Sequence, residues 1–441
     1  MRLLALITAS LLLLGALPAA ASSNNVDPAS LTFHKDVQSI LQRNCQSCHR
    51  AEGVVLGGMI APMSLTTYEE IRPWARSIAK QVQSRSMPPW FADEKFHGVF
   101  STERTLTDEE IETVVAWARN GAPKGDPADA PPPLDTSGIV DGWTIGKPDL
   151  VLSLAEPFFV DDDVRDLNIT LPAEFITEEM MPEPRYIEAI EFRAGSNIVH
   201  HIVGSKNAQE AETPGATGLL AGLAPGTEPF ALPEGYGRLL TPNTQIYLNM
   251  HYNKEPGEDT GRWDRSQVAI KFKPKTETIE HIAQWEGIGN QDFEIPPNTE
   301  DWKVGASKIF RHDATIFGFI PHMHLRGRYA KYEAFYPDGT REVLLEVPWY
   351  DWNWQTNYLY NDPKRIPAGT RVEVTMWYDN TKEREEIIKG QGTDITADRA
   401  VSWGGPTYEE MMIGFIDYAY EVPLNHEANN PDFGTGGGGG Q

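Results

Sequence analysis

Several histidines are grouped closely between residues 200 and 324. The stretch "FIPHMHLRGR" carries His322 and His324 with one residue between them, and "IVHHIVG" carries the adjacent pair His200 and His201. His251 follows in "NMHYN". Imidazole nitrogen is a common ligand of copper, zinc, iron and nickel, so these residues at these spacings predict metal binding.

Strand geometry decides how such residues can share an ion. Alternate residues of a strand lie on one face, so His322 and His324 can bind one ion from a regular strand. Adjacent His200 and His201 need a bulge, or Nδ1 from one ring and Nε2 from the other, and a second strand must bring His251. Three further histidines of this region stand alone and predict no site: His281, His312 and His426.

The two cysteines, Cys45 and Cys48, stand in "NCQSCHR" and are followed at once by His49. A Cys-x-x-Cys-His run is the attachment signal of a c-type haem, in which the thiols add to the vinyl groups and the histidine binds iron. A redox dithiol of the thioredoxin type would follow a strand, but the residues on either side of this motif have the pattern of helices. Zinc would need a second pair of ligands, and no further cysteine exists. The run therefore predicts one covalent haem.

The sixth ligand of such a haem is expected from Met87 in "SRSMPPW". The consecutive prolines keep the following loop extended and stiff, which helps to hold a thioether in place. A methionine opposite a histidine favours reduced iron. Met63 in "APMSL" and His97 compete for this role, and packing is the alternative role for Met87.

A sulfur ligand is also available to these histidines. Met411 and Met412 stand in "TYEEMMIGFIDY" at the start of an apolar strand. A thioether ligand would favour Cu(I). On spacing alone, however, core methionines on a strand are the better interpretation of this pair.

The elements that position these residues change in character along the chain. Up to residue 127, apolar residues recur at helical spacing, as in "FHKDVQSILQRN" and in "LTDEEIETVVAWARNG", where Thr107 is the expected N-cap and Gly121 the stop. Beyond 141, apolar and polar residues alternate over strand lengths, as in "YIEAIEFRA", "TQIYLNMHYN" and "TRVEVTMWYDN". This order predicts a small all-α domain followed by two all-β sandwiches.

Length, charge and the first residues fit an exported protein. The chain has 441 residues, 40% of them hydrophobic, which is enough for several cores. A net charge of −25 argues against a nucleic-acid partner. The apolar run "LLALITASLLLLGAL" and the small residues up to Ala21 predict a cleaved signal peptide, hence a periplasmic or secreted protein. A membrane anchor is the alternative, but the run is short for a span, so stable membrane insertion is not expected.

The predicted domains follow these changes in composition. A Pro/Asp-rich stretch, "GDPADAPPPLDTSG", separates the helical part from the strands, and the chain ends in "GTGGGGGQ". The expected order is 1–21 signal peptide, 22–127 cytochrome c domain, 128–140 linker, 141–278 first β-sandwich, 279–430 second β-sandwich and 431–441 flexible tail.

In their order and spacing, "IVHHIVG", "HYN", "PHMH" and "TYEEMM" resemble the type II copper monooxygenases, the group of the peptidylglycine and dopamine β-monooxygenases. The resemblance implies two jelly-roll-like sandwiches that carry one copper each. It favours Met411 over Met412, because the family's methionine directly follows an acidic residue, as Met411 follows Glu410. The implied ligand sets are His200, His201 and His251 for an electron-transfer copper, and His322, His324 and Met411 for the copper that activates O₂.

The front end resembles the cytochrome c domains fused to bacterial relatives of these enzymes. There "APMSL", "YEEIRPWA" and "MPPW" also match, which supports Met87 over Met63. The combined resemblance implies a periplasmic copper-dependent monooxygenase that hydroxylates a C–H bond of a small organic substrate. It would receive electrons from a periplasmic donor through its own haem.

The sequence also departs from this family. Peptide-processing members carry a carboxylate-anchoring arginine where this chain has Ile320, and an asparagine and a tyrosine where it has Ile413 and Phe415. A glycine-extended peptide is therefore not the expected substrate. The sequence leaves two roles open for Arg326 and Arg328: contact with the substrate, or ion pairing within the protein. The alternative function is a non-catalytic copper and haem protein for electron transfer or sensing.

Overall fold

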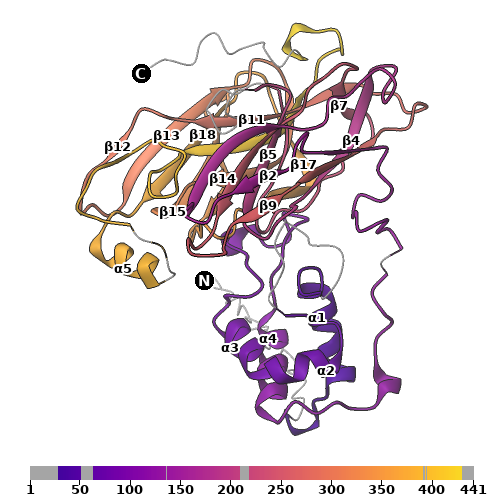
Figure 1. Cartoon of the computed structure of the whole chain (residues 1–441), viewed down its shortest axis with the longest axis vertical. Helices are drawn as coiled ribbons and strands as arrows, with labels where there is room; N and C mark the ends of the chain where they lie inside the picture. The colour runs from indigo at the N-terminus through magenta and orange to yellow at the C-terminus, as the bar shows by residue number, and fades with distance from the viewer. Residues whose placement is uncertain are drawn as a thin grey trace, which may run out of the picture.

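The computed structural model describes residues 28–50, 63–135, 137–208, 218–390, 393 and 395–429. The expected signal peptide, 1–21, and the expected tail, 431–441, lie outside these residues. Figure 1 shows the helices α1–α4 gathered at one end of the molecule and the strands at the other. No helix in the described ranges has the length and apolar character needed to cross a membrane.

The helical end forms where apolar spacing predicts it. Val37, Ile71 and Trp117 are fully buried in one core. Thr107 caps α4 through a capping box with Glu110, which confirms the expected start of this helix. The helical elements are η1 Pro28–Ser30, η2 Phe33–Val37, α1 Gln38–Asn44, α2 Tyr68–Ile71, η4 Arg72–Trp74, α3 Ala75–Gln83, η5 Glu94–Phe96, α4 Asp108–Arg119, η6 Pro127–Asp129, α5 Lys382–Gly390 and η7 Glu427–Asn429.

The strands fall into two halves along the chain. The first half holds β1 Leu150–Ser153, β2 Phe158–Val160, β3 Asp166–Pro172, β4 Arg185–Arg193, β5 Val199–Ser205, β6 Leu219–Leu223, β7 Tyr236–Leu240, β8 Tyr247–Asn253, β9 Arg262–Asp264 and β10 Gln267–Phe272. The second half holds β11 His281–Gly289, β12 Glu294–Ile295, β13 Trp302–Ile309, β14 Ala314–His322, β15 Gly327–Phe335, β16 Arg341–Val347, β17 Tyr358–Ile366, β18 Arg371–Tyr378, β19 Val401–Ser402 and β20 Ile413–Tyr420.

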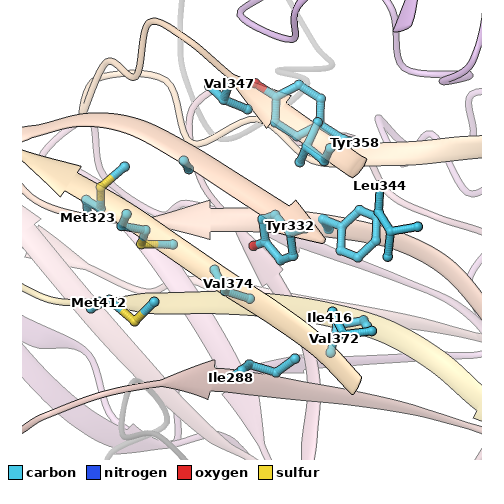
Figure 2. Packing of buried hydrophobic residues seen from close by; sticks show 14 of the residues in the cluster. Ile288, Met323, Tyr332, Leu344, Val347, Tyr358, Val372, Val374, Met412 and Ile416 are labelled. Carbon is cyan, nitrogen blue, oxygen red and sulfur yellow. The ribbon is translucent and has the colours of Figure 1, made fainter. Parts of the chain in front are cut away.

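Each half is a pair of facing sheets with its own core. In the first half, strands β1-β10-β4-β7 face β3-β8-β5-β6. In the second, β11-β20-β14-β17 face β13-β18-β15-β16, and Tyr332, Val374 and Ile416 pack between them (Figure 2). Parallel pairing of β11 with β7, which sets His281 opposite Tyr236, joins one sheet of each half into a continuous eight-stranded sheet.

Burial explains why these segments are strands. In β18, Val372, Val374 and Met376 are buried while the residues between them are only partly covered, as the alternating sequence predicted. The predicted β-sandwich architecture is confirmed at this level. The expected boundary between residues 278 and 279 falls in the connection from β10 to β11.

One segment of the helical end packs on the second half, which the expected separate domain 22–127 did not anticipate. This docking segment is residues 90–104. Phe100 is 2% exposed within the core of the second half, and the Trp90 ring centroid lies 5.0 Å from that of Tyr358. Thr102 Oγ1 donates to the Asn357 carbonyl at 2.7 Å. The helical end is therefore attached to the strands by packing as well as by the chain.

Candidate metal centre

The adjacent histidines lie on β5, whose pairing with β8 is irregular between Val199 and His201. Such a bulge breaks the alternation of side chains, so two neighbouring rings can turn toward one space. The ring centroids of His200 and His201 are 5.4 Å apart, and their Nδ1 atoms are 3.2 Å apart. The bulge that two adjacent ligands require is thus present.

His251 completes a triad with these two residues. It lies on β8 directly opposite His201, with its ring centroid 4.7 Å from that of His201 and 5.7 Å from that of His200. One ligand nitrogen from each ring lies within 4.8 Å of the other two. Two nitrogens on one tetrahedral ion at about 2.0 Å are about 3.3 Å apart, so the triad needs only a small contraction to hold an ion.

His322 and His324 lie beside the triad rather than in a separate place. The ring centroid of His322 is 5.6 Å from that of His201, and that of His324 is 6.2 Å from that of His251. All of these rings are buried except that of His200, which is half-buried. The structure therefore brings the five predicted histidines into one five-histidine cluster where the two halves meet.

Three of these rings donate one N–H to an oxygen acceptor: His251 Nε2 to Asp166 Oδ1 at 3.1 Å, His322 Nδ1 to Gln355 Oε1 at 2.8 Å, and His324 Nδ1 to the Glu409 carbonyl at 3.3 Å. A proton fixed on one ring nitrogen leaves the lone pair of the other nitrogen for a metal. His251 Nδ1 is buried with no hydrogen-bond partner among the described residues, as a ligand atom would be. The donor set therefore fits a transition metal.

Met411 and Met412 belong to different packing clusters. Met412 points into the core of the second half (Figure 2). Met411 lies with Ile413 and Phe415 in a smaller cluster between the halves. His322 pairs with Ile413, and its ring centroid is 6.1 Å from that of Phe415. Met411 is therefore on the side of the chain that faces the histidines, and Met412 is not.

Trp352, between β16 and β17, covers the cluster. Its indole stacks on the His200 ring with 3.9 Å between centroids and 12° between planes. Its centroid also lies 5.5 Å from those of His251 and His324. Because this side chain is only 6% exposed, it shields the rings from water and joins the two halves.

Burial also controls the charge of the cluster. Burial, followed by repulsion from the other four histidines, lowers the pKa of His200 well below its ordinary value. Neutral imidazole is the form that binds metal. Burial raises the pKa of Asp166, but hydrogen bonds from His251 and Thr407 outweigh it, and the net shift of that pKa is downward. Asp166 is therefore ionised, and its carboxylate accepts a hydrogen bond from His251.

The two arginines that follow the His322/His324 pair, Arg326 and Arg328, form hydrogen bonds and ion pairs with other residues of the chain. Arg328 pairs with Glu300 and Asp301 at the surface. Arg326 is fully buried and donates to Asn380 Oδ1 at 2.8 Å, the Tyr408 carbonyl at 2.8 Å and the Thr396 carbonyl at 3.0 Å. These contacts favour structural roles for both over contact with a substrate.

Glu410 connects residues 407–411, the Met411 segment, to the His322/His324 pair. Its carboxylate accepts from the backbone N–H of His324 at 2.9 Å and from that of Arg326 at 2.6 Å. Burial raises the pKa of Glu410 to about 7, against the opposing effect of the Arg326 charge and these two N–H groups. The residue before Met411 thus positions the loop that carries His324.

The isolated histidines make other contacts. His281 Nε2 lies 3.2 Å from Glu421 Oε2, and the rings of His312 and His426 are 4.8 Å apart. His97 is paired with Glu103 through Nδ1 at 2.7 Å. None of these contacts connects the residues to the five-histidine cluster.

Cys45 and Cys48 lie in the turn after α1 as free thiols. Burial, and secondarily the charge of Cys48, raises the pKa of Cys45 to about 12. A reactive dithiol lowers the pKa of its nucleophile instead, so this environment does not suit thiol exchange. His49 Nδ1 donates to the Met63 carbonyl at 3.1 Å, which leaves the lone pair on Nε2. Met87 follows α3 and is half-buried.

Several residues around the cluster had no signal in the sequence. Asp166, Trp352 and Gln355 come from strands or loops far from any histidine in the chain. Their residue types are ordinary, and only the pairing of strands brings them to the site. Glu410 is part of the motif "TYEEMM", but the sequence indicated it only as the residue that precedes Met411.

Comparison with known proteins does not assign a family. No family model and no curated protein matches the chain. Among solved structures, the chain is similar to the VP2 subviral particle of infectious bursal disease virus, with 8% identity, 64% of this chain and 74% of that chain covered, and a TM-score of 0.20. It is also similar to vicilin from Solanum lycopersicum (tomato), with 9% identity, 58% and 75% covered, and a TM-score of 0.13. Scores this low carry no argument about fold or function.

Proposed function

We propose that this protein is a periplasmic copper-dependent monooxygenase that hydroxylates a C–H bond of a small organic substrate with O₂. The observation that carries the proposal is the five-histidine cluster, in which two ligand sets, one from each half of the chain, lie next to each other. The histidine and methionine motifs in those halves are similar to motifs of the type II copper monooxygenases. The proposal includes a jelly-roll topology for both sandwiches.

The ligand sets divide along the two halves. His200, His201 and His251 would hold an electron-transfer copper, and His322, His324 and Met411 the copper at which O₂ is activated. Copper bound there would supply one-electron redox chemistry and O₂ binding. The chain contributes fixed tautomers through oxygen acceptors, a thioether that favours Cu(I), and exclusion of water by Trp352.

The helical end is the proposed haem-bearing unit. Cys45 and Cys48 would attach the haem, with His49 and Met87 as axial ligands, and the haem would pass on electrons from a periplasmic donor. The docking segment begins shortly after Met87 and contacts Asn357, two residues beyond Gln355, which holds the His322 ring. A segment that follows the proposed haem ligand Met87 is thus packed against the loop that supports the proposed O₂ site.

A metal count tests this proposal. The purified chain, reconstituted with copper and zinc together, should retain two coppers. His251→Ala and His322→Ala should each lower the count by about one, or weaken one site by about tenfold or more. His312→Ala is the matched control, since this histidine contacts His426 rather than the cluster. A wild-type count of one, or zinc retained in place of copper, would contradict the proposal.

Burial of the cluster favours a second candidate, a non-catalytic electron-transfer or sensor protein. His322 and His324 are 1% and 0% exposed, and an organic substrate would have to reach their metal. An electron carrier needs no such access. The two candidates differ in O₂ consumption by the reduced, copper-loaded chain, which only the monooxygenase shows.

A further inference from the structure

Asp166, at the start of β3, connects the two halves beside the five-histidine cluster. Its side chain is 7% exposed. Oδ1 accepts from His251 Nε2 at 3.1 Å. Oδ2 accepts from Thr407 Oγ1 at 2.7 Å, from Thr407 N at 3.4 Å and from Asn253 Nδ2 at 3.2 Å. One carboxylate therefore binds a triad histidine with one oxygen and a residue of the second half with the other.

Thr407 belongs to the segment that supplies Met411. It is 3% exposed and precedes Glu410, whose carboxylate binds the backbone of His324 and Arg326. The Thr407 hydroxyl donates to the Asp166 carboxylate, so this segment is in direct contact with the partner of His251. Thr407 and Met411 belong to the same segment of the chain.

We infer that Asp166 is a positioning residue that couples the two metal positions. The inference rests on the proposed function in that both positions bind metal. Through Oδ1, Asp166 keeps the proton on His251 Nε2 and directs the Nδ1 lone pair to the ion. Through Oδ2, it links the geometry of that ligand to the Met411 segment. Coupling between binding sites is reciprocal, so a metal held by the Met411 segment changes the affinity of the triad by the same factor as a metal in the triad changes the affinity at the Met411 segment.

The test is the affinity of the full-length chain for Cu(II), measured by competition with a chelator, together with the Cu(II) EPR signal of the triad. Asp166→Ala should weaken the triad about 10- to 100-fold, as loss of an outer partner of a metal-binding histidine does. Thr407→Val should weaken it about fivefold, the effect of one lost hydrogen bond. Thr407→Ser keeps the hydroxyl and should restore wild-type affinity and the wild-type EPR signal.

The double variant separates coupling from general damage. If Thr407 acts through Asp166, Thr407→Val should have no further effect on the triad in a chain that already carries Asp166→Ala. Wild-type affinity in Thr407→Val, or additive losses in the double variant, would overturn the inference while leaving the copper count intact. A wild-type chain that binds no Cu(II) would overturn both the inference and the proposed function. If Asp166→Ala does not fold, the Thr407→Val and Thr407→Ser pair still decides the question.

Discussion

At the residue scale, the cluster depends on which nitrogen of each imidazole carries the proton. Asp166, Gln355 and the Glu409 carbonyl each accept a hydrogen bond from one imidazole nitrogen. The other nitrogen of each ring then carries the lone pair that can bind a metal. Without these acceptors, histidines at the same positions would bind metal less tightly, because ring orientation and tautomer would vary. Residue type and spacing alone therefore describe only part of the site.

The contrast between Arg326 and Arg328 gives a prediction at this scale. Arg326→Ala would leave the buried acceptors of Asn380, Tyr408 and Thr396 without their donor, so the free energy of unfolding should fall by about 3 kcal/mol or more. Arg328→Ala removes a partly exposed ion pair and should cost about 1 kcal/mol or less. Urea unfolding followed by tryptophan fluorescence measures both. Equal losses for the two variants would show that Arg326 is not the buried support described here.

At the scale of elements, the irregular pairing in β5 matters most. The sequence predicted that two adjacent histidines need a bulge or different ring nitrogens, and the register changes between Val199 and His201. The pairing of His201 with His251 then follows from the register of β5 and β8. Strand alternation predicted His322 and His324 as a pair on one strand face, but β14 ends at His322, and His324 lies in the loop that follows. What could not be predicted was the closeness of the two sets, since it depends on how the halves pack.

The helical end carries a prediction about the haem. The Met63 carbonyl accepts from His49 Nδ1, so Met63 is held on the side of the ring away from Nε2, the nitrogen that would bind haem iron. Met87→Ala should therefore change the axial-ligand absorption bands, whereas Met63→Ala should not. Haem should stay on the denatured chain, and Cys48→Ala should weaken or abolish this retention. A spectral change in Met63→Ala alone would reverse the ligand assignment.

The docking segment carries a prediction about stability. Phe100 comes from the part of the chain predicted as the cytochrome domain, yet it is buried in the core of the second half. Phe100→Ala should lower the free energy of unfolding of the strands by about 3–5 kcal/mol. Trp74→Ala, at a 43% exposed aromatic of the helical end, should change it by about 0.5 kcal/mol or less. If the strands unfold as in wild type when Phe100 is removed, the packing of this segment is weaker than described.

At the scale of the whole molecule, two sandwiches joined by β7 and β11 hold the cluster where they meet. Alternation along the strands predicted both halves and their cores. The joined sheet, the cover provided by Trp352 and the link from Asp166 to Thr407 arise only from packing between segments far apart in sequence. Such contacts leave no local pattern, so they could not be predicted from one sequence.

The central claim is that the cluster with Met411 activates O₂. The most direct measurement is reductant-dependent O₂ uptake by the copper-loaded chain, comparing Met411→Leu with Met412→Leu. Both changes remove one sulfur and nearly preserve volume, but only Met411 lies on the side of the histidines. We predict uptake by the wild type and by Met412→Leu, and its loss in Met411→Leu with copper still bound at the triad. A wild type that takes up no O₂ in any reduced, copper-loaded state would contradict the claim and leave the electron-transfer protein in its place.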